Sequence, residues 1–203
     1  MTNLIKLKFT DFWKGQVSGK VENNPIYKLL KKHFNVELSD HPDFLIYDSN
    51  GLEYLKYSCP RIFYTGENRR PNFDQCDYAF SFDYPFTERN YRLPLYRLWG
   101  GYDKLLEPRQ SSTEFSPRQG FCCFLASKSI MLRNEFFHLL SNYKKVDSGG
   151  SLFNNIGQRV PRGGEVDWMR NYKFSIVFEN AAHPGYTTEK IMRALLANTI
   201  PIY

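Results

Sequence analysis

The sequence predicts an α/β protein in which parallel strands are flanked by helices. Short apolar runs typical of buried strands alternate with amphipathic, helix-like stretches along nearly the whole chain. With 203 residues, 42% of them hydrophobic, the chain can bury one large core or two small ones. A polar stretch at residues 105–117 has no periodicity and carries two prolines. We therefore predict two domains, at residues 1–116 and 117–203.

The N-terminal part begins the alternation of strands and helices. Residues 4–9 alternate apolar and basic side chains, as a half-buried strand does, and Asn24-Pro25 is a typical helix start. Further strands are predicted at residues 35–38, 44–48 and 61–65, with helices at 26–34 and 51–58. Between residues 77 and 99, the alternation continues with YAFSFDY and RLPLYRLW.

The C-terminal part repeats the alternation. Strands are predicted at residues 120–127, 173–180 and 199–203, with helices at 130–143, 165–171 and 187–197. A glycine-containing loop is predicted at residues 147–151. Cys122 and Cys123 are adjacent in the first of these strands, so their side chains should point to opposite faces. The four cysteines lack paired metal-site spacing and are expected to be reduced, mostly buried thiols.

Charge and hydropathy exclude several classes of function. The net charge is +6, but the basic residues are scattered and form no nucleic-acid motif, so we expect no nucleic-acid partner. No apolar run approaches the roughly 20 residues that cross a bilayer, and the N-terminus lacks the apolar core of a secretory signal. These features predict a cytoplasmic location.

The most informative segment is FENAAHPGYTTEK, at residues 178–190, where a strand leads through a loop into a helix. In parallel α/β sheets, ligands bind beyond the carboxyl ends of strands, where helix N-termini favour anions. Thr187 or Thr188 can cap the helix, Glu189 can accept bonds from sugar hydroxyls, and Lys190 can pair with phosphate. Taken alone, TTEK would instead be read as a capped helix start with Lys190 in solvent.

This segment resembles the donor-binding signature of the α-1,3/1,4-fucosyltransferases, glycosyltransferase family 10. Upstream, YTGEN, then PNFDQCDYAFSFD, RLPLY and LRN are similar to the same family in the same order. Nearly the whole chain is covered by this resemblance, which is to bacterial-type members.

The resemblance implies a GT-B fold, with two Rossmann-like domains and the donor GDP-fucose held mainly by the C-terminal one. It places Asn180, Tyr186, Glu189 and Lys190 at the donor site, with Glu189 on ribose hydroxyls and Lys190 on the diphosphate. Arg133, in the LRN match, would be a second phosphate cation. Local sequence alone favours a different place for Arg133, the exposed face of an amphipathic helix.

The resemblance also implies an inverting transfer of L-fucose from GDP-β-L-fucose to an N-acetylglucosamine hydroxyl. The acceptor is a galactose-containing oligosaccharide such as N-acetyllactosamine, in α-1,3 or α-1,4 linkage. Glu67 in YTGEN matches the proposed catalytic base of the family; without that match it reads as a surface glutamate in a turn. The sequence has no DxD motif, so no metal is expected. His183, within the donor loop, is more readily explained as a structural residue.

Family members continue beyond the point that corresponds to residue 203. We therefore expect the C-terminal domain to be incomplete, with peripheral membrane contact possible through the missing segment, and activity of the 203 residues alone is in doubt. Two alternatives stay open. One is another GT-B nucleotide-sugar transferase of surface polysaccharide synthesis, such as lipopolysaccharide; the other is an inactive fragment that only binds a glycan or nucleotide.

Overall fold

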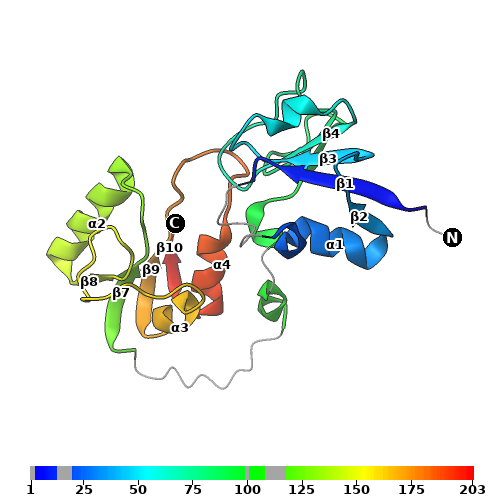
Figure 1. Cartoon of the computed structure of the whole chain (residues 1–203). Coiled ribbons are helices and arrows are strands. Elements are labelled where there is room, and N and C mark those ends of the chain that lie inside the picture. The colour runs from blue at the N-terminus through cyan, green and yellow to red at the C-terminus, as the bar shows by residue number, and fades with distance from the viewer. Residues whose placement is uncertain (1–2, 13–19, 99–100, 108–117) are drawn as a thin grey trace. The chain divides into compact units, whose positions relative to one another are not determined.

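A computed structural model describes residues 3–12, 20–98, 101–107 and 118–203, and it shows an α/β protein with two parallel sheets (Figure 1). The chain forms two compact units. The first comprises residues 1–99 together with His183–Tyr186, and the second comprises residues 100–182 and 187–203. The predicted domain boundary at residue 116 lies outside the described residues.

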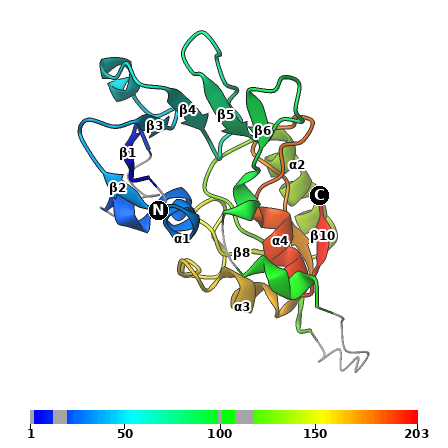
Figure 2. The ribbon, with the colours of Figure 1, turned by 90° about the vertical axis from the view of Figure 1, so that its right-hand side faces the viewer.

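The described part of the first unit contains a six-stranded parallel sheet in the order β2-β1-β3-β4-β5-β6. Figure 2 shows the later strands of this series side by side. The strands are β1 (Ile5–Thr10), β2 (Val36–Leu38), β3 (Phe44–Tyr47), β4 (Arg61–Tyr64), β5 (Tyr78–Ser81) and β6 (Asn90–Arg92). Helix α1 spans Pro25–His33, and 3-10 helices lie at Val21–Asn23, Glu53–Lys56 and Leu95–Arg97.

Helix α1 begins where the sequence indicates. The side chain of Asn24 accepts a hydrogen bond from the N–H of Ile26 at 2.9 Å, and Pro25 occupies the first helical position. Ile26 and Tyr27 are buried in a cluster with Leu7 of β1. Burial of one apolar face thus fixes α1 against the sheet (Figure 1).

The described part of the second unit has a four-stranded parallel sheet in the order β10-β9-β7-β8. Its strands are β7 (Gly120–Phe124), β8 (Val146–Ser148), β9 (Tyr172–Ile176) and β10 (Ile200–Ile202). Its helices are α2 (Met131–Tyr143), α3 (Glu165–Met169) and α4 (Glu189–Leu196), with a 3-10 helix at Tyr102–Leu105.

The two faces of this second sheet carry separate cores. Cys122 packs with Phe137 of α2, whereas Cys123 packs with Met169 of α3 and Ala194 of α4. Helix α2 therefore covers one face and helices α3 and α4 the other (Figure 1). The expected opposite orientation of the two free, buried cysteines is confirmed.

One local prediction was wrong in part. A glycine-containing loop was expected at residues 147–151. Its first two residues, Asp147 and Ser148, instead belong to the three-residue strand β8, which pairs with β7. Such a short strand is defined by pairing with its neighbour rather than by its own pattern. The run RLPLYRLW begins with Arg92, the last residue of strand β6, and continues as the 3-10 helix at Leu95–Arg97. Pro94 lies between the two elements and cannot donate a ladder hydrogen bond.

Both sheets follow the same strand order. In each unit the first strand lies between the second and the third, so the order of strands reverses at the gap between the first and third strands. In the first unit this point lies between β1 and β3, and in the second between β7 and β9. Ligands of doubly wound sheets bind beyond the carboxyl ends of the strands at this point.

Candidate donor-binding site

A pocket opens in the second unit where the strand order reverses. Its walls come from the ends of β7 and β9, with one side chain from α2, Met169 of α3, and Lys190 and Arg193 of α4. The lining residues are Cys123, Phe124, Leu125, Arg133, Met169, Ser175, Ile176, Val177, Phe178, Lys190 and Arg193. Three cations thus border a pocket whose floor is largely apolar, an arrangement suited to an anionic ligand.

Arg133, in the first turn of α2, is buried, with only 4% of its surface exposed. One terminal nitrogen of its guanidinium donates to the backbone oxygen of Lys128, and the group lies over the ring of Phe124, 5.8 Å from the centroid. Its Nε has no partner among the described residues. Burial lowers the pKa of Arg133, and the negative charge of Glu179 opposes that shift. A buried cation with an unused donor at a pocket wall is a candidate anion ligand.

The start of helix α4 is organised by Glu179, a residue that the sequence analysis did not single out. Its side chain is 6% exposed and accepts hydrogen bonds from the N–H of Thr188 at 2.7 Å and from the Thr188 hydroxyl at 2.8 and 2.9 Å. Its Oε2 also accepts from Nζ of Lys190 at 2.8 Å. Thr188 is the N-cap by position, but its hydroxyl bonds this carboxylate instead of a helix N–H, so the expected side-chain cap was wrong.

Glu189 has its own partner in the structure. Its carboxylate lies 3.6 Å from a guanidinium nitrogen of Arg193, one helical turn later, and Arg193 also approaches Glu165 at 3.9 Å. The ring of Tyr102 lies in the same cluster: burial raises the pKa of this phenol, and the charge of Arg193 opposes that rise. Glu189 is thus anchored on α4 within a network of charges.

The structure brings together some of the predicted donor-site residues. Arg133 and Lys190 line the pocket, so the local expectation of an exposed Arg133 was wrong. Asn180 is half-buried, two residues beyond the lining residue Phe178. Tyr186 is buried, and its ring packs against Phe82 of the first unit, with centroids 4.9 Å apart.

Glu67 lies in the first unit, in the loop that follows strand β4. Its side chain is exposed, and its N–H donates to the hydroxyl of buried Thr65 at 3.2 Å. Nearby, Arg69 donates to the backbone oxygen of Ser49, after strand β3, at 3.0 Å. These contacts hold the loop at the carboxyl edge of the sheet.

The described residues form neither a cluster of metal-ligating side chains nor a membrane-spanning helix. Within them, no group of three or more histidine, cysteine, aspartate or glutamate side chains is placed to hold a metal ion. None of the helices they form is both long enough and apolar enough to cross a membrane.

Comparison with known families gives two matches that together span most of the chain. The family model of the α-(1,3)-fucosyltransferase FucT N-terminal domain matches residues 7–99. The model of the C-terminal part of glycosyltransferase family 10, the fucosyltransferases, matches residues 116–203.

Individual relatives agree with these matches. The α-(1,3)-fucosyltransferase FucT of Helicobacter pylori is 29% identical over 98% of this chain, and the chain spans 50% of that protein. Human α-(1,3)-fucosyltransferase 4 is 35% identical over 47% of the chain, which covers 18% of the human protein. The chain thus spans half or less of the length of these curated relatives.

Solved structures resemble the fold along the whole chain. A crystal structure of an α1,3-fucosyltransferase superposes with a TM-score of 0.81 and 27% identity, covering 100% of this chain and 69% of that one. An α1,3-fucosyltransferase crystallised with GDP-fucose gives a TM-score of 0.79 and 28% identity, covering 98% of this chain and 68% of that one. The sequence, the GT-B fold with its two Rossmann-like sheets and these matches agree: the chain belongs to glycosyltransferase family 10, the fucosyltransferases.

Proposed function

We propose that this chain carries the donor site and the catalytic base of a fucosyltransferase that uses GDP-β-L-fucose as its donor. The observation that carries the proposal is the pocket at the strand-order reversal of the second unit, with Arg133 and Lys190 in its wall. A solved relative of the same fold is bound to GDP-fucose, which supports the same donor for this chain.

Arg133 and Lys190 would bind the diphosphate of the donor. Arg133 has an unused buried donor, and Lys190 is held by Glu179 with 25% of its side chain exposed, so both can reach an anion in the pocket. Their positive charge would stabilise the charge that develops on the β-phosphate as GDP departs. Asn180, Tyr186 and Glu189 would complete the donor site, with Glu189 accepting hydrogen bonds from the ribose.

Glu67 would act as the general base. In an inverting transfer, the acceptor oxygen forms its bond to C1 of fucose as the bond from C1 to the β-phosphate oxygen breaks. The electron pair of the broken bond leaves with GDP, and the proton of the acceptor hydroxyl moves to the carboxylate of Glu67. The position of Glu67, an exposed residue in the loop after strand β4, supports this role.

The acceptor would be an N-acetylglucosamine hydroxyl of a galactose-containing glycan such as N-acetyllactosamine, with α-1,3 linkage favoured by the names of the relatives. The setting would be cytoplasmic assembly of a surface glycan carrying a Lewis-type antigen, including lipopolysaccharide.

Titration calorimetry with GDP-fucose, GDP-mannose and GDP tests the donor assignment. Binding of GDP-fucose in preference to GDP-mannose is expected. Arg133→Met and Lys190→Met should each weaken it by about tenfold or more, because each removes a hydrogen bond to a charged group. Arg170→Met is the matched control, since Arg170 is an exposed arginine of the same unit that pairs with Asp167 outside the pocket.

Transfer of labelled fucose to N-acetyllactosamine tests the reaction itself. Tighter binding of GDP-mannose would favour a different nucleotide-sugar transferase. Donor binding with no transfer to any galactose-containing acceptor would indicate a binding fragment rather than a catalyst.

A further inference from the structure

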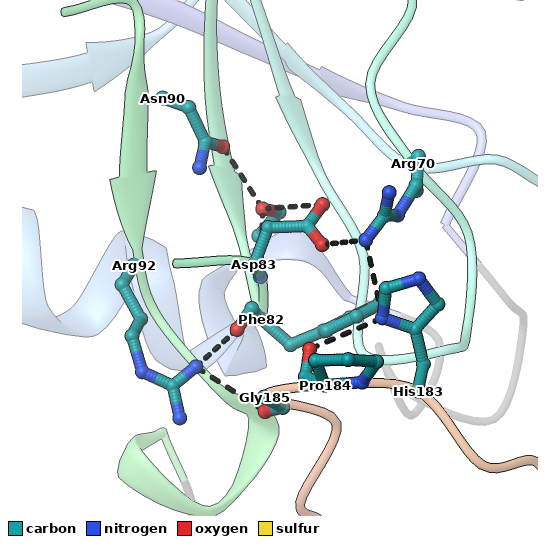
Figure 3. A network of polar contacts seen from close by, with 9 residues as sticks. Arg70, Phe82, Asp83, Asn90, Arg92, His183, Pro184 and Gly185 are labelled. Carbon is teal, nitrogen blue, oxygen red and sulfur yellow. Dashed lines mark hydrogen bonds and ion pairs between the residues drawn. The ribbon is translucent and has the colours of Figure 1, made fainter. Parts of the chain in front are cut away.

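The loop His183–Tyr186 belongs to the donor signature, yet by its contacts it is part of the first unit. Arg92, the last residue of β6, donates from one terminal nitrogen to two backbone oxygens, those of Phe82 and of Gly185 (Figure 3). The bond to Gly185 is 3.2 Å long. One guanidinium thus joins the end of the first sheet to a loop that lies 93 residues later in the sequence.

The aromatic ring of Phe82 holds the same loop. It packs edge-on against Tyr186 and against His183, with centroid separations of 4.9 and 5.6 Å. The N–H of Tyr186 donates to the backbone oxygen of His183 at 2.9 Å, which closes the loop into a turn. Phe82 is only 2% exposed, so the loop rests on a buried aromatic surface.

Gly185 is required by this contact for two separate reasons. Its φ is +85°, a backbone conformation that favours glycine. A Cβ at this position would also lie 2.8 Å from the Phe82 oxygen and 3.2 Å from the donating nitrogen of Arg92. Only a residue without a side chain allows the loop to approach Arg92 this closely.

A second arginine contacts the loop from the other side. Arg70, three residues after Glu67, pairs with the buried carboxylate of Asp83, and the same nitrogen lies 3.1 Å from Nδ1 of His183 (Figure 3). The same Nδ1 also lies 3.1 Å from the backbone oxygen of Pro184, so the ring of His183 has two polar neighbours. The segment that carries Glu67 is thereby bonded to the donor-signature loop.

We infer that Arg92 is a positioning residue for donor binding, because it fixes the loop His183–Tyr186 in the conformation that leads into Thr187, Thr188 and helix α4. The inference rests on the proposed function. Thr188 follows Tyr186 by two residues and bonds Glu179, which in turn holds Lys190. Releasing the loop would therefore free the backbone just before the residues proposed to bind phosphate.

Hydrogen–deuterium exchange tests the contact independently of any activity. In Arg92→Met the amide of Tyr186 should exchange at least about tenfold faster, because the turn that protects it is no longer held. Arg89→Met is the matched control. Arg89 likewise donates to backbone oxygens, those of Phe73, Cys76 and Asp77, but does not contact the loop. Equal exchange at Tyr186 in both variants would overturn the inference.

Calorimetry with GDP on the same proteins tests the positioning role. Arg92→Met should weaken GDP binding by about tenfold, Arg89→Met should leave it unchanged, and Arg92→Lys should restore part of the affinity because an ammonium can still donate to both oxygens. Faster exchange with unchanged GDP affinity would overturn the positioning role. If the unaltered chain binds no GDP, the proposed function fails, whereas the exchange comparison still decides whether Arg92 holds the loop.

A glycine pair gives the same test without altering a charge. Gly185→Ala should release the loop and weaken GDP binding as Arg92→Met does. Gly157→Ala is the control. Gly157 also has a positive φ, +80°, but no atom lies within 4 Å of the added methyl group. This substitution should therefore strain only the local backbone and leave GDP affinity unchanged. Equal GDP affinities for these two variants would also refute the inference.

Discussion

Replacing Glu179 by alanine should destabilise the second unit more than any single surface change. The substitution leaves the buried N–H and hydroxyl of Thr188 without their acceptor, and it removes the partner of Lys190. Breaking a buried ion pair costs about 3–5 kcal/mol. Because a quarter of the Lys190 side chain remains exposed, solvent recovers part of that loss, and we expect about 2–3 kcal/mol.

For a chain of this size, each kcal/mol lowers the thermal midpoint by about 2–4 °C, so the expected fall is roughly 4–12 °C. Circular dichroism of thermal unfolding measures it. The thermal midpoint of Glu179→Gln should fall by less, because the amide oxygen can still accept a hydrogen bond from Thr188. Glu53→Ala is the matched control, because Glu53 forms an exposed ion pair with Lys56 and should contribute little. If Glu179→Ala shifts the midpoint no more than Glu53→Ala, Glu179 does not organise α4.

Three further predictions concern other sites. Burial raises the pKa of Asp48 above the ordinary carboxyl value. Between these two pKa values, the folded state keeps a proton that the unfolded state loses. The stability of the fold therefore falls as pH rises through that window. Asp48→Asn should therefore melt above the unaltered chain at about pH 7, with a smaller gap at about pH 4; an equal gap at both would contradict this. Glu67→Gln should reduce fucose transfer by about 10²-fold or more while leaving GDP-fucose affinity unchanged in calorimetry; loss of donor affinity would argue against a role as base. Burial raises the pKa of the Cys122 and Cys123 thiols to about 12, so neither should react with a thiol reagent at about pH 8 before unfolding, and rapid labelling of the native chain would refute that burial.

The fold was predictable from the sequence wherever an element carries its own pattern. The alternation in residues 4–9 gave strand β1 (Ile5–Thr10), and the periodic run at 130–143 gave α2 (Met131–Tyr143). Strand β8 was missed, because three residues are too few to show a period and β8 exists through pairing with β7.

The candidate site was only partly predictable, since burial and partners depend on distant residues. Arg133 looks exposed on its helix, and its burial depends on the packing of α2 over Phe124. Glu179 directly precedes Asn180 in the signature, but its role in holding the start of α4 becomes visible only from its contacts with Thr188 and Lys190 in the folded chain. Nothing near Arg92 in the sequence points to a partner at Gly185.

The discontinuous make-up of the first unit has a consequence for how the protein is made. A ribosome delivers residues 1–99 long before His183–Tyr186, so the nascent first unit lacks the loop that contacts Phe82. At about 5–20 residues per second, the interval is several seconds or more, during which Phe82 would be without these two covering rings. In a fragment ending near residue 99, this surface of Phe82 would never be covered by the two rings. Such a fragment is expected to aggregate more readily than the longer chain.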